Sequence, residues 1–319
     1  MLFYAMKSQK ALNALITGVS GFVGPYLVKH LVRSGFEVFG VDRIGKKVEG
    51  CAVDKCDVTD YDSVFSVVKR VRPDFVFHLA GQSSVEKSWK EPELTRAVHV
   101  IGTKNLLDAV AAAKINPKIL IVSSAEVYGI PKALPISEGH PVQPITPYGE
   151  SRAEQEKLAL GYFRNKGVQL VISRSFNQTG PGQPSAFVCS DFARQVVEAE
   201  KGRRTEIIVG NLDIRRDFTD VRDAVGAYLL ALQKGKPGEI YNVCSGSSHS
   251  IKSVLDTFLS LSAKARSAKV VRGVSKTRKT DIPELVGDST KFSRATGWKP
   301  LIKFETTLSE MLDYWRKSL

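Results

Sequence analysis

The stretch Ala14-Leu-Ile-Thr-Gly18-Val-Ser-Gly21-Phe-Val-Gly24 decides the fold. It reads as a short apolar strand, a glycine turn and the start of a helix. Gly18 permits the tight turn, Gly21 lets the backbone approach a pyrophosphate, and Gly24 lets the helix pack on the strand. Free N–H groups and the positive dipole end at the helix start favour a bound phosphate. We therefore predict a dinucleotide-binding turn, in which Phe22 and Val23 also line the cofactor.

Strand and helix signals alternate through the first half of the chain. Apolar runs at residues 14–17, 37–41, 75–78 and 119–123 are typical of strands that are buried on both faces. Residues 25–34, 61–71 and 95–113 carry apolar side chains at helical spacing. This alternation predicts an α/β fold with a doubly wound parallel sheet and right-handed crossovers.

The pattern changes after about residue 130. Residues 131–147 contain five prolines and predict a long loop. We expect a helix at 148–165, strands at 170–173 and 240–243, and two helices after residue 250 that are separated by a basic loop. Residues 1–174 with about 216–244 are expected to form the cofactor domain. Residues 175–215 and 245–319 are expected to form a smaller, interleaved substrate domain.

The ends of the predicted strands supply further candidate cofactor ligands. Asp42 ends the second strand, 18 residues beyond Gly24, where a carboxylate binds both ribose hydroxyls and repels a 2′-phosphate. We therefore expect NAD(H) to be preferred, with NADP(H) possible because Arg43 follows. The other candidates are Asp57, Val58, Leu79, Ala80, Gly81 and Ser123. His78 is expected to be a hydrogen-bonded core histidine rather than a chemical group.

A second group of residues is suited to proton transfer. Tyr148 and Arg152 lie four apart on one predicted helix, so both can point into one cleft. A fixed cation favours the ionised form of a neighbouring phenol, which allows the phenol to move a proton near neutral pH. Ser124 can hydrogen-bond the same substrate oxygen. We predict that these three residues are catalytic and that Tyr148 and Arg152 also contact the cofactor.

These motifs resemble those of the extended short-chain dehydrogenase/reductases, the family of sugar-nucleotide epimerases and dehydratases. The resemblance runs from the glycine turn through the Tyr148 helix to Thr296-Gly-Trp-Lys-Pro300. It implies a Rossmann domain, a smaller substrate domain and an NAD(P)-dependent enzyme. It also implies a homodimer joined by a four-helix bundle, here from residues 95–113 and 148–165.

Two residues depart from the family pattern. Arg152 stands where the family has lysine, and His99 stands where it has asparagine. Arginine keeps the positive charge, although its planar group is bulkier. We interpret His99 as a compensating change, since the two positions are near neighbours in the family. The alternative is a slow or inactive homologue that still binds the cofactor.

The segment Ser175-Phe-Asn177-Gln-Thr-Gly180-Pro-Gly-Gln183 resembles the substrate loop of the family's GDP-sugar branch, especially of its GDP-4-keto-6-deoxymannose reductases. This implies a GDP-linked hexose substrate, with the binding residues Ser84, Asn177, Phe187, Val188, Arg216, Arg278 and Asp281. The related GDP-mannose 4,6-dehydratases use a glutamate at the position of Glu126 as a base, so Glu126 is a further catalytic candidate. The resemblance favours a reductase, then a dehydratase, then a 4-epimerase.

Composition narrows the possible partners and compartment. Lys and Arg number 46 against 33 Asp and Glu, so the formal charge is +13. The basic stretches at 201–204 and 264–278 lack interleaved aromatic residues, so we expect no nucleic-acid partner. Four cysteines without ligand spacing predict free thiols and no metal site. With no long apolar run and no signal peptide, we expect a cytoplasmic protein without a membrane partner.

Overall fold

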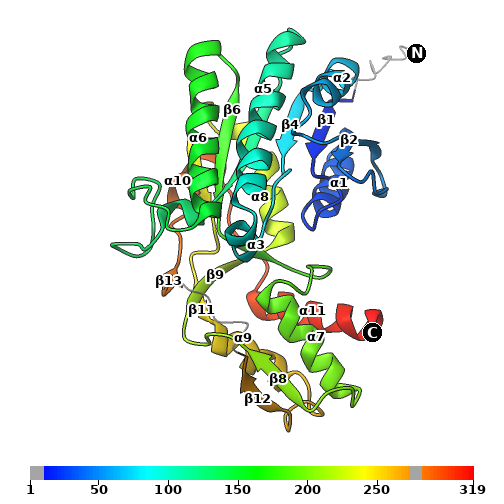
Figure 1. Cartoon of the computed structure of the whole chain (residues 1–319), viewed down its shortest axis with the longest axis vertical. Helices are drawn as coiled ribbons and strands as arrows, with labels where there is room; N and C mark the ends of the chain where they lie inside the picture. The colour runs from blue at the N-terminus through cyan, green and yellow to red at the C-terminus, as the bar shows by residue number, and fades with distance from the viewer. Residues whose placement is uncertain (1–10, 274–281) are drawn as a thin grey trace, which may run out of the picture.

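The computed structural model describes residues 11–273 and 282–319 and has a large and a small lobe (Figure 1). The large lobe contains a seven-stranded sheet in the order β10-β6-β5-β4-β1-β2-β3, with every neighbouring pair parallel. The strands are β1 Asn13–Thr17, β2 Glu37–Asp42, β3 Ala52–Lys55, β4 Phe75–His78, β5 Lys118–Ser124, β6 Leu170–Ser175 and β10 Ile240–Val243. The predicted doubly wound parallel sheet is confirmed.

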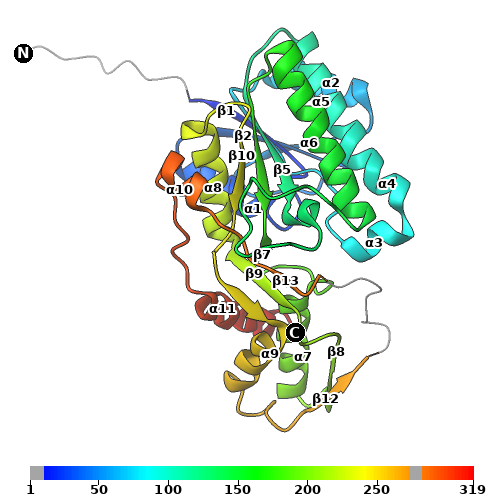
Figure 2. The same cartoon turned by 90° about the vertical axis from the view of Figure 1, so that its left-hand side faces the viewer.

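Helices cover both faces of this sheet (Figure 2). One face packs against α1 (Gly24–Arg33), α8 (Val221–Lys234) and α10 (Thr290–Thr296). The other packs against α2 (Tyr61–Val71), α5 (Gly102–Ala112) and α6 (Pro147–Lys166). The strand residues are apolar on both faces because each face is covered by helices.

Local sequence sets the ends of α6, the helix that carries Tyr148 and Arg152. Thr146 Oγ1 accepts a hydrogen bond from the Gly149 amide at 3.0 Å, and Pro147 occupies the first helical position. Gly167 ends the helix with a positive φ of 67°. The preceding residues 131–146 contain no helix and only an isolated bridge at Ile136, so the predicted loop is confirmed.

The single helix expected over residues 95–113 has more parts than predicted. The chain forms α3 (Val85–Lys90), α4 (Pro92–Arg96), a π-helical turn at Ala97–Ile101 and then α5. Apolar spacing does not reveal the extra residue of a π turn, which is why this prediction was wrong in detail. Such turns occur often at functional sites, and this one carries the buried His99.

The described part of the small lobe combines two small sheets with three helices. Strand β9 (Arg215–Asp220) pairs with β7 (Asn177–Thr179), β11 (Ser248–Ser250) and β13 (Glu284–Leu285), and β8 (Glu206–Val209) pairs with β12 (Lys269–Arg272). A third apolar cluster joins α7 (Val188–Glu200), α9 (Ile251–Ser260) and α11 (Phe304–Ser318). Among the described residues after 250 the helices are α9, α10 and α11, one more than the predicted two. The short α10 was missed, and its Phe292 packs in the core of the large lobe.

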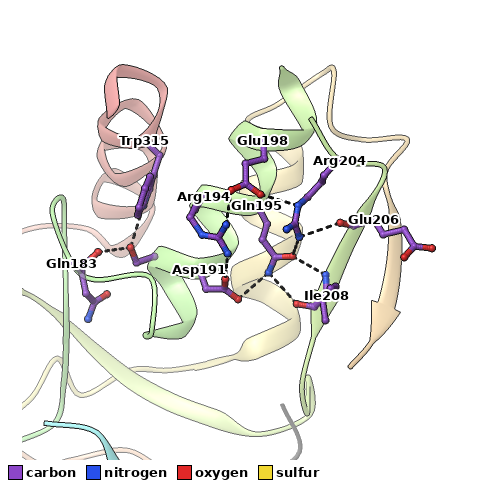
Figure 3. Close-up of polar contacts among 10 residues, drawn as sticks. Gln183, Asp191, Arg194, Gln195, Glu198, Arg204, Glu206, Ile208 and Trp315 are labelled. Atoms are coloured by element: carbon purple, nitrogen blue, oxygen red, sulfur yellow. Dashed lines mark hydrogen bonds and ion pairs between the residues drawn. The ribbon is translucent and has the colours of Figure 1, made fainter. Parts of the chain in front are cut away.

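Polar contacts hold α7 in place (Figure 3). The Gln195 amide accepts from Ile208 N–H at 2.8 Å and donates to Ile208 O at 3.0 Å, which joins α7 to β8. Trp315 Nε1 on α11 donates to Ser190 Oγ at 3.1 Å, and Ser190 donates to the carbonyl of Gln183. These bonds fix the start of α7 beside the 180–183 loop.

Two further features concern the cysteines and the helices. All four cysteines are unpaired, and three of them are buried. Within the described ranges, no helix is both long and apolar enough to cross a membrane.

Candidate active site

The glycine turn leaves the space that a dinucleotide requires. Gly18 has a φ of +70°, and a Cβ there would lie 2.8 Å from Ala80 Cα. A Cβ on Gly24 would lie 1.9 Å from the carbonyl oxygen of Val19. Helix α1 then begins with a proline in its first turn and no acidic side chain there. The turn thus fits a pyrophosphate at the helix start.

Phe22 lies between this turn and the small lobe, and Val23 follows it in the chain. Both are partly exposed, and the Phe22 ring lies within 3.7 Å of the position a Cβ would take on Gly180. Tyr26 on α1 donates to the carbonyl of Pro181 at 2.7 Å. The cofactor turn and the predicted substrate loop are therefore in direct contact.

The remaining cofactor candidates lie at the carboxyl edge of the sheet, because β1, β2, β3 and β4 are parallel. Asp42 ends β2, and its Oδ1 accepts from Ile44 N–H at 2.9 Å. Arg43 is exposed. Asp57 Oδ1 accepts from both the amide and the hydroxyl of Thr59. Val58 is buried, and the segment Leu79, Ala80 and Gly81 follows β4 beside the turn.

Tyr148 and Arg152 meet at the same edge. Arg152 Nε lies 3.4 Å from Tyr148 Oη, and the Arg152 guanidinium carbon lies 5.3 Å from the centre of the phenol ring. Arg152 Nη1 donates to Val122 O and to Gln155 Oε1, both at 2.9 Å. The structure thus brings together the predicted phenol and cation, and both are buried.

The two adjacent serines point in different directions, as neighbours on a strand do. Ser123 Oγ donates to Glu156 Oε1 at 2.6 Å and is buried, so its hydroxyl is committed inside the fold. Ser124 is partly exposed and accepts from Glu126 N–H at 3.2 Å. In the part of the chain that the structure describes, no acceptor binds the Ser124 hydroxyl hydrogen, which leaves it for a substrate oxygen.

His99 lies next to Arg152, as the compensation hypothesis requires. A Cβ on Gly81 would lie 2.7 Å from Arg152 Nη2 and 3.1 Å from His99 Nε2. His99 bonds Ser151 Oγ at 2.7 Å and Gln82 O at 3.0 Å. Burial first, and then the Arg152 charge, lower the pKa of His99 to about 2. A neutral imidazole is therefore the form compatible with the neighbouring cation.

His78 is a fully buried core histidine, as predicted. It bonds Thr17 Oγ1 at 2.8 Å and Thr103 Oγ1 at 3.0 Å. Burial, followed by the Arg152 charge, lowers its pKa to about 3. No role in proton transfer follows from this arrangement.

Four of the candidate substrate residues, Asn177, Phe187, Val188 and Arg216, lie in the small lobe. Asn177 is exposed on β7, and Phe187 and Val188 stand at the start of α7. Arg216 on β9 is buried, and its Nη1 donates to Ile282 O at 2.7 Å and to Arg215 O at 2.8 Å. Ser84 caps α3 by accepting from Lys87 N–H. Arg278 and Asp281 lie outside the described residues.

Sequence reasoning missed Gln155, which binds Arg152 directly. The residue is fully buried one turn beyond Arg152 on α6. Its spacing of three residues was a usable signal, because such pairs share a helix face.

Comparison with known proteins finds relatives over most of the chain. A family model described as GDP-mannose 4,6 dehydratase matches residues 15–311. The GDP-6-deoxy-D-mannose reductase of Pseudomonas aeruginosa is 32% identical over 305 residues, covering 94% of this chain and 96% of that protein. The GDP-mannose 4,6 dehydratase of Homo sapiens is 27% identical over 335 residues, covering 94% and 90%.

Solved structures show the same architecture. RMD from Pseudomonas aeruginosa, complexed with NADPH, gives a TM-score of 0.84 at 31% identity, covering 97% of this chain and 100% of that one. The UDP-glucose 4-epimerase of Thermus thermophilus, complexed with NAD, gives 0.86 at 28% identity, covering 97% and 100%. The match over residues 15–311 includes the glycine turn, the Tyr148 helix and most of the small lobe. The chain therefore belongs to the GDP-mannose 4,6 dehydratase family of extended short-chain dehydrogenase/reductases.

Proposed function

We propose that the protein is an NAD(P)H-dependent reductase of a GDP-linked 4-keto-6-deoxyhexose. The observation that carries this proposal is the contact of Tyr148 with Arg152 beside the glycine turn. The 32% identity to the reductase of Pseudomonas aeruginosa supports the substrate class. The hydrogen bond from Tyr26 on α1 to Pro181 supports it further, because it holds the proposed substrate loop beside the cofactor turn.

Each side chain has a defined task in this proposal. The bound cofactor supplies a hydride to the keto carbon. Ser124 donates its free hydroxyl hydrogen to the keto oxygen, and Tyr148 gives that oxygen a proton. Arg152 stabilises the phenolate that remains, since an adjacent cation favours the charged form. Fixed donors of this kind act where charge develops in the transition state.

The small lobe is proposed to hold the nucleotide. Arg216 supplies a positive charge for the pyrophosphate, and its orientation is fixed by two backbone carbonyls. Asn177 on the neighbouring strand β7 is exposed for a sugar or phosphate contact. Phe187 and Val188 form the guanine pocket. Ser84, Arg278 and Asp281 complete the proposed set.

Asp42 remains the basis for preferring NAD(H). Its Oδ1 accepts the Ile44 amide, and within the described residues its Oδ2 has no hydrogen bond, which leaves that oxygen for a ribose hydroxyl. The structural relatives include complexes with NADPH and with NAD. Use of either cofactor by the family is therefore compatible with the proposal, and the preference stays a prediction.

A second activity, 4,6-dehydration of GDP-mannose, is favoured by Glu126, which lies beside Ser124 at the end of β5. In this reaction Tyr148 first removes a proton from a sugar hydroxyl. Glu126 then acts as the base in the elimination of water. A 4-epimerase ranks third. Replacement of the family lysine by Arg152 keeps a catalytically weak homologue as the remaining alternative.

The test uses Tyr148→Phe, which removes the proton donor but not the ring. We expect wild-type protein to oxidise NADH with GDP-4-keto-6-deoxymannose, and the variant to lose about 10²–10⁴-fold in turnover, as expected for a lost acid–base group. Incubation of GDP-mannose without reductant provides the second arm. Formation of a keto sugar there, without NADH oxidation in the first arm, would assign the dehydratase instead.

We also propose a cytoplasmic homodimer built through α5 and α6. These helices pack side by side, and Leu94 and Ile101 are exposed near them. Four free cysteines fit a reducing compartment. Light scattering should give twice the 35.0 kDa chain mass, and a single-chain mass at micromolar concentration would contradict the dimer.

A further inference from the structure

Gln155 joins Arg152 to the interior of the large lobe. Its Oε1 accepts from Arg152 Nη1 at 2.9 Å, and its Nε2 donates to Thr103 Oγ1 at 2.7 Å. A guanidinium has only donors, so the amide oxygen must face Arg152. The amide therefore has one orientation, and its nitrogen is directed at Thr103.

Thr103 has its full complement of hydrogen bonds. It donates to the carbonyl of His99 at 2.6 Å and accepts from Gln155. Its remaining lone pair must accept from His78 Nε2, which is 3.0 Å away. His78 Nδ1 then accepts from Thr17, whose oxygen accepts the Ala80 amide at 3.1 Å. The row of bonds from Arg152 thus ends on backbone next to the glycine turn.

The five N–H groups of Arg152 point partly into the large lobe and partly toward Tyr148 and the cofactor turn. Both Nη1 hydrogens are used by Val122 O and Gln155, and Nε faces Tyr148 Oη. Nη2 lies beside Gly81, and no acceptor in residues 11–273 or 282–319 binds it. Gln155 and the Val122 carbonyl together therefore fix the rotation of the guanidinium plane, and this rotation aims Nε at the phenol and Nη2 at the cofactor side.

Lysine does not need such a partner. An ammonium group presents three equivalent rotating hydrogens, whereas a guanidinium is planar and must be oriented to be useful. Neutral His99 lies beside Arg152 Nη2 and bonds Ser151 and Gln82. It therefore fills the space next to the guanidinium without adding a second positive charge.

We propose that Gln155 is the positioning residue that allows an arginine to act at position 152. The proposal rests on the proposed function, because it takes Tyr148 and Arg152 as the chemical pair. It predicts that Gln155 matters for Arg152 and not for a lysine at the same position.

A double-mutant cycle tests this. Gln155→Met keeps the unbranched length but has no amide, and it is made in the wild-type protein and in the Arg152→Lys variant. The readouts are the dissociation constant of NADH, measured by fluorescence without sugar, the turnover number and the thermal midpoint. In the wild-type background we expect about a 10-fold loss of NADH affinity and of turnover, the size of one hydrogen bond to a charged group. In the Arg152→Lys background the loss should stay below about 2-fold.

Equal losses in both backgrounds would overturn the proposal, because they would mean that Gln155 only supports the fold. Gln155→Glu is the second variant, since it keeps an oxygen for Arg152 and the same volume. It should bind NADH within about 3-fold of wild type, because a carboxylate accepts from a guanidinium at least as well as an amide does. A loss of NADH affinity as large as that of Gln155→Met would contradict the role of Gln155 Oε1 as the hydrogen-bond acceptor for Arg152. If the wild type binds NADH but reduces no GDP-keto sugar, the proposed function fails. The double-mutant cycle on NADH affinity still decides the role of Gln155 in that case.

Discussion

Arg152 Nε lies 3.4 Å from Tyr148 Oη, and the guanidinium also stands over the phenol ring. The two residues are one helical turn apart at the start of α6, so the helix alone brings them together. Gln155, one further turn along, accepts a hydrogen bond from Arg152 Nη1. Under the proposed function, this arginine and the amide that binds it take the part of the family's lysine beside the tyrosine.

The glycine turn should be intolerant of any side chain. Gly18→Ala places a Cβ 2.8 Å from Ala80 Cα and strains a φ of +70°. We expect NADH affinity to fall more than about 10-fold, because the backbone must move where the pyrophosphate binds. Gly35→Ala is the matched control, since its φ is +83° but no atom lies within 4 Å of its Cβ position. It should lose about 1 kcal/mol of stability and keep NADH affinity, measured by fluorescence titration. Equal NADH affinity in both variants would contradict the assignment of the Gly18 turn as the cofactor site.

Glu126→Gln separates the two leading activities. A reductase does not need this carboxylate as a base, so keto-sugar reduction should change by less than about 5-fold. A dehydratase should lose about 10²–10⁴-fold, the contribution of a general base. Both rates are measured on the same preparation, with the Glu150→Gln variant as a control, because Glu150 is an exposed carboxylate in the first turn of α6. Loss of NADH oxidation comparable to that of Tyr148→Phe would assign Glu126 a direct part in reduction.

The buried histidines should make folding stability depend on pH. In the unfolded chain a histidine binds a proton below about pH 6.5. In the folded protein burial keeps the pKa of His78 near about 3 and that of His99 near about 2. Protons therefore favour the unfolded chain, and stability is lost as pH falls below about 6.5. The slope is ~1.4 kcal/mol per pH unit for each histidine, or about 3 kcal/mol for the two between pH 7.5 and 5.5.

Guanidinium denaturation at these two pH values measures the effect. His99→Asn, which restores the family residue, should remove about half of the slope. A free energy of unfolding that is unchanged between pH 7.5 and 5.5 would contradict the assignment of both rings as neutral and buried.

Two ion pairs that involve α6 should contribute very differently to the free energy of unfolding. Glu156 and Arg174 are both 5% exposed and are joined by several hydrogen bonds, the shortest at 2.7 Å. Glu156→Gln leaves a buried guanidinium without its charge partner, and we expect a loss of about 3–5 kcal/mol. Glu154 pairs with Arg96 on the surface, where the side chains are 41% and 56% exposed. Glu154→Gln should cost less than about 1 kcal/mol. Similar denaturation midpoints for the two variants would contradict this difference.

The alternation of apolar runs was sufficient to predict the parallel sheet, and the four early strands lie within one residue of their predicted bounds. Tyr148 and Arg152 were predicted together because one helix carries both. The π turn around His99 and the helix α10 were missed, since a π turn and a seven-residue helix leave no distinct spacing. The hydroxyl of Ser123 could not be placed either, because its partner Glu156 comes from another element. Local patterns predict elements, whereas contacts between elements depend on packing.

Reduction of GDP-4-keto-6-deoxymannose by the purified wild-type protein tests the central claim most directly. The loss of reduced-nicotinamide absorbance is followed with NADH and then with NADPH. The account predicts that both the sugar and the cofactor are consumed in equal amounts, and that NADH is used with the higher kcat/KM because of Asp42. Binding of NADH without any consumption, together with no reaction of GDP-mannose, would contradict the claim and would leave a homologue that binds the cofactor but has lost turnover.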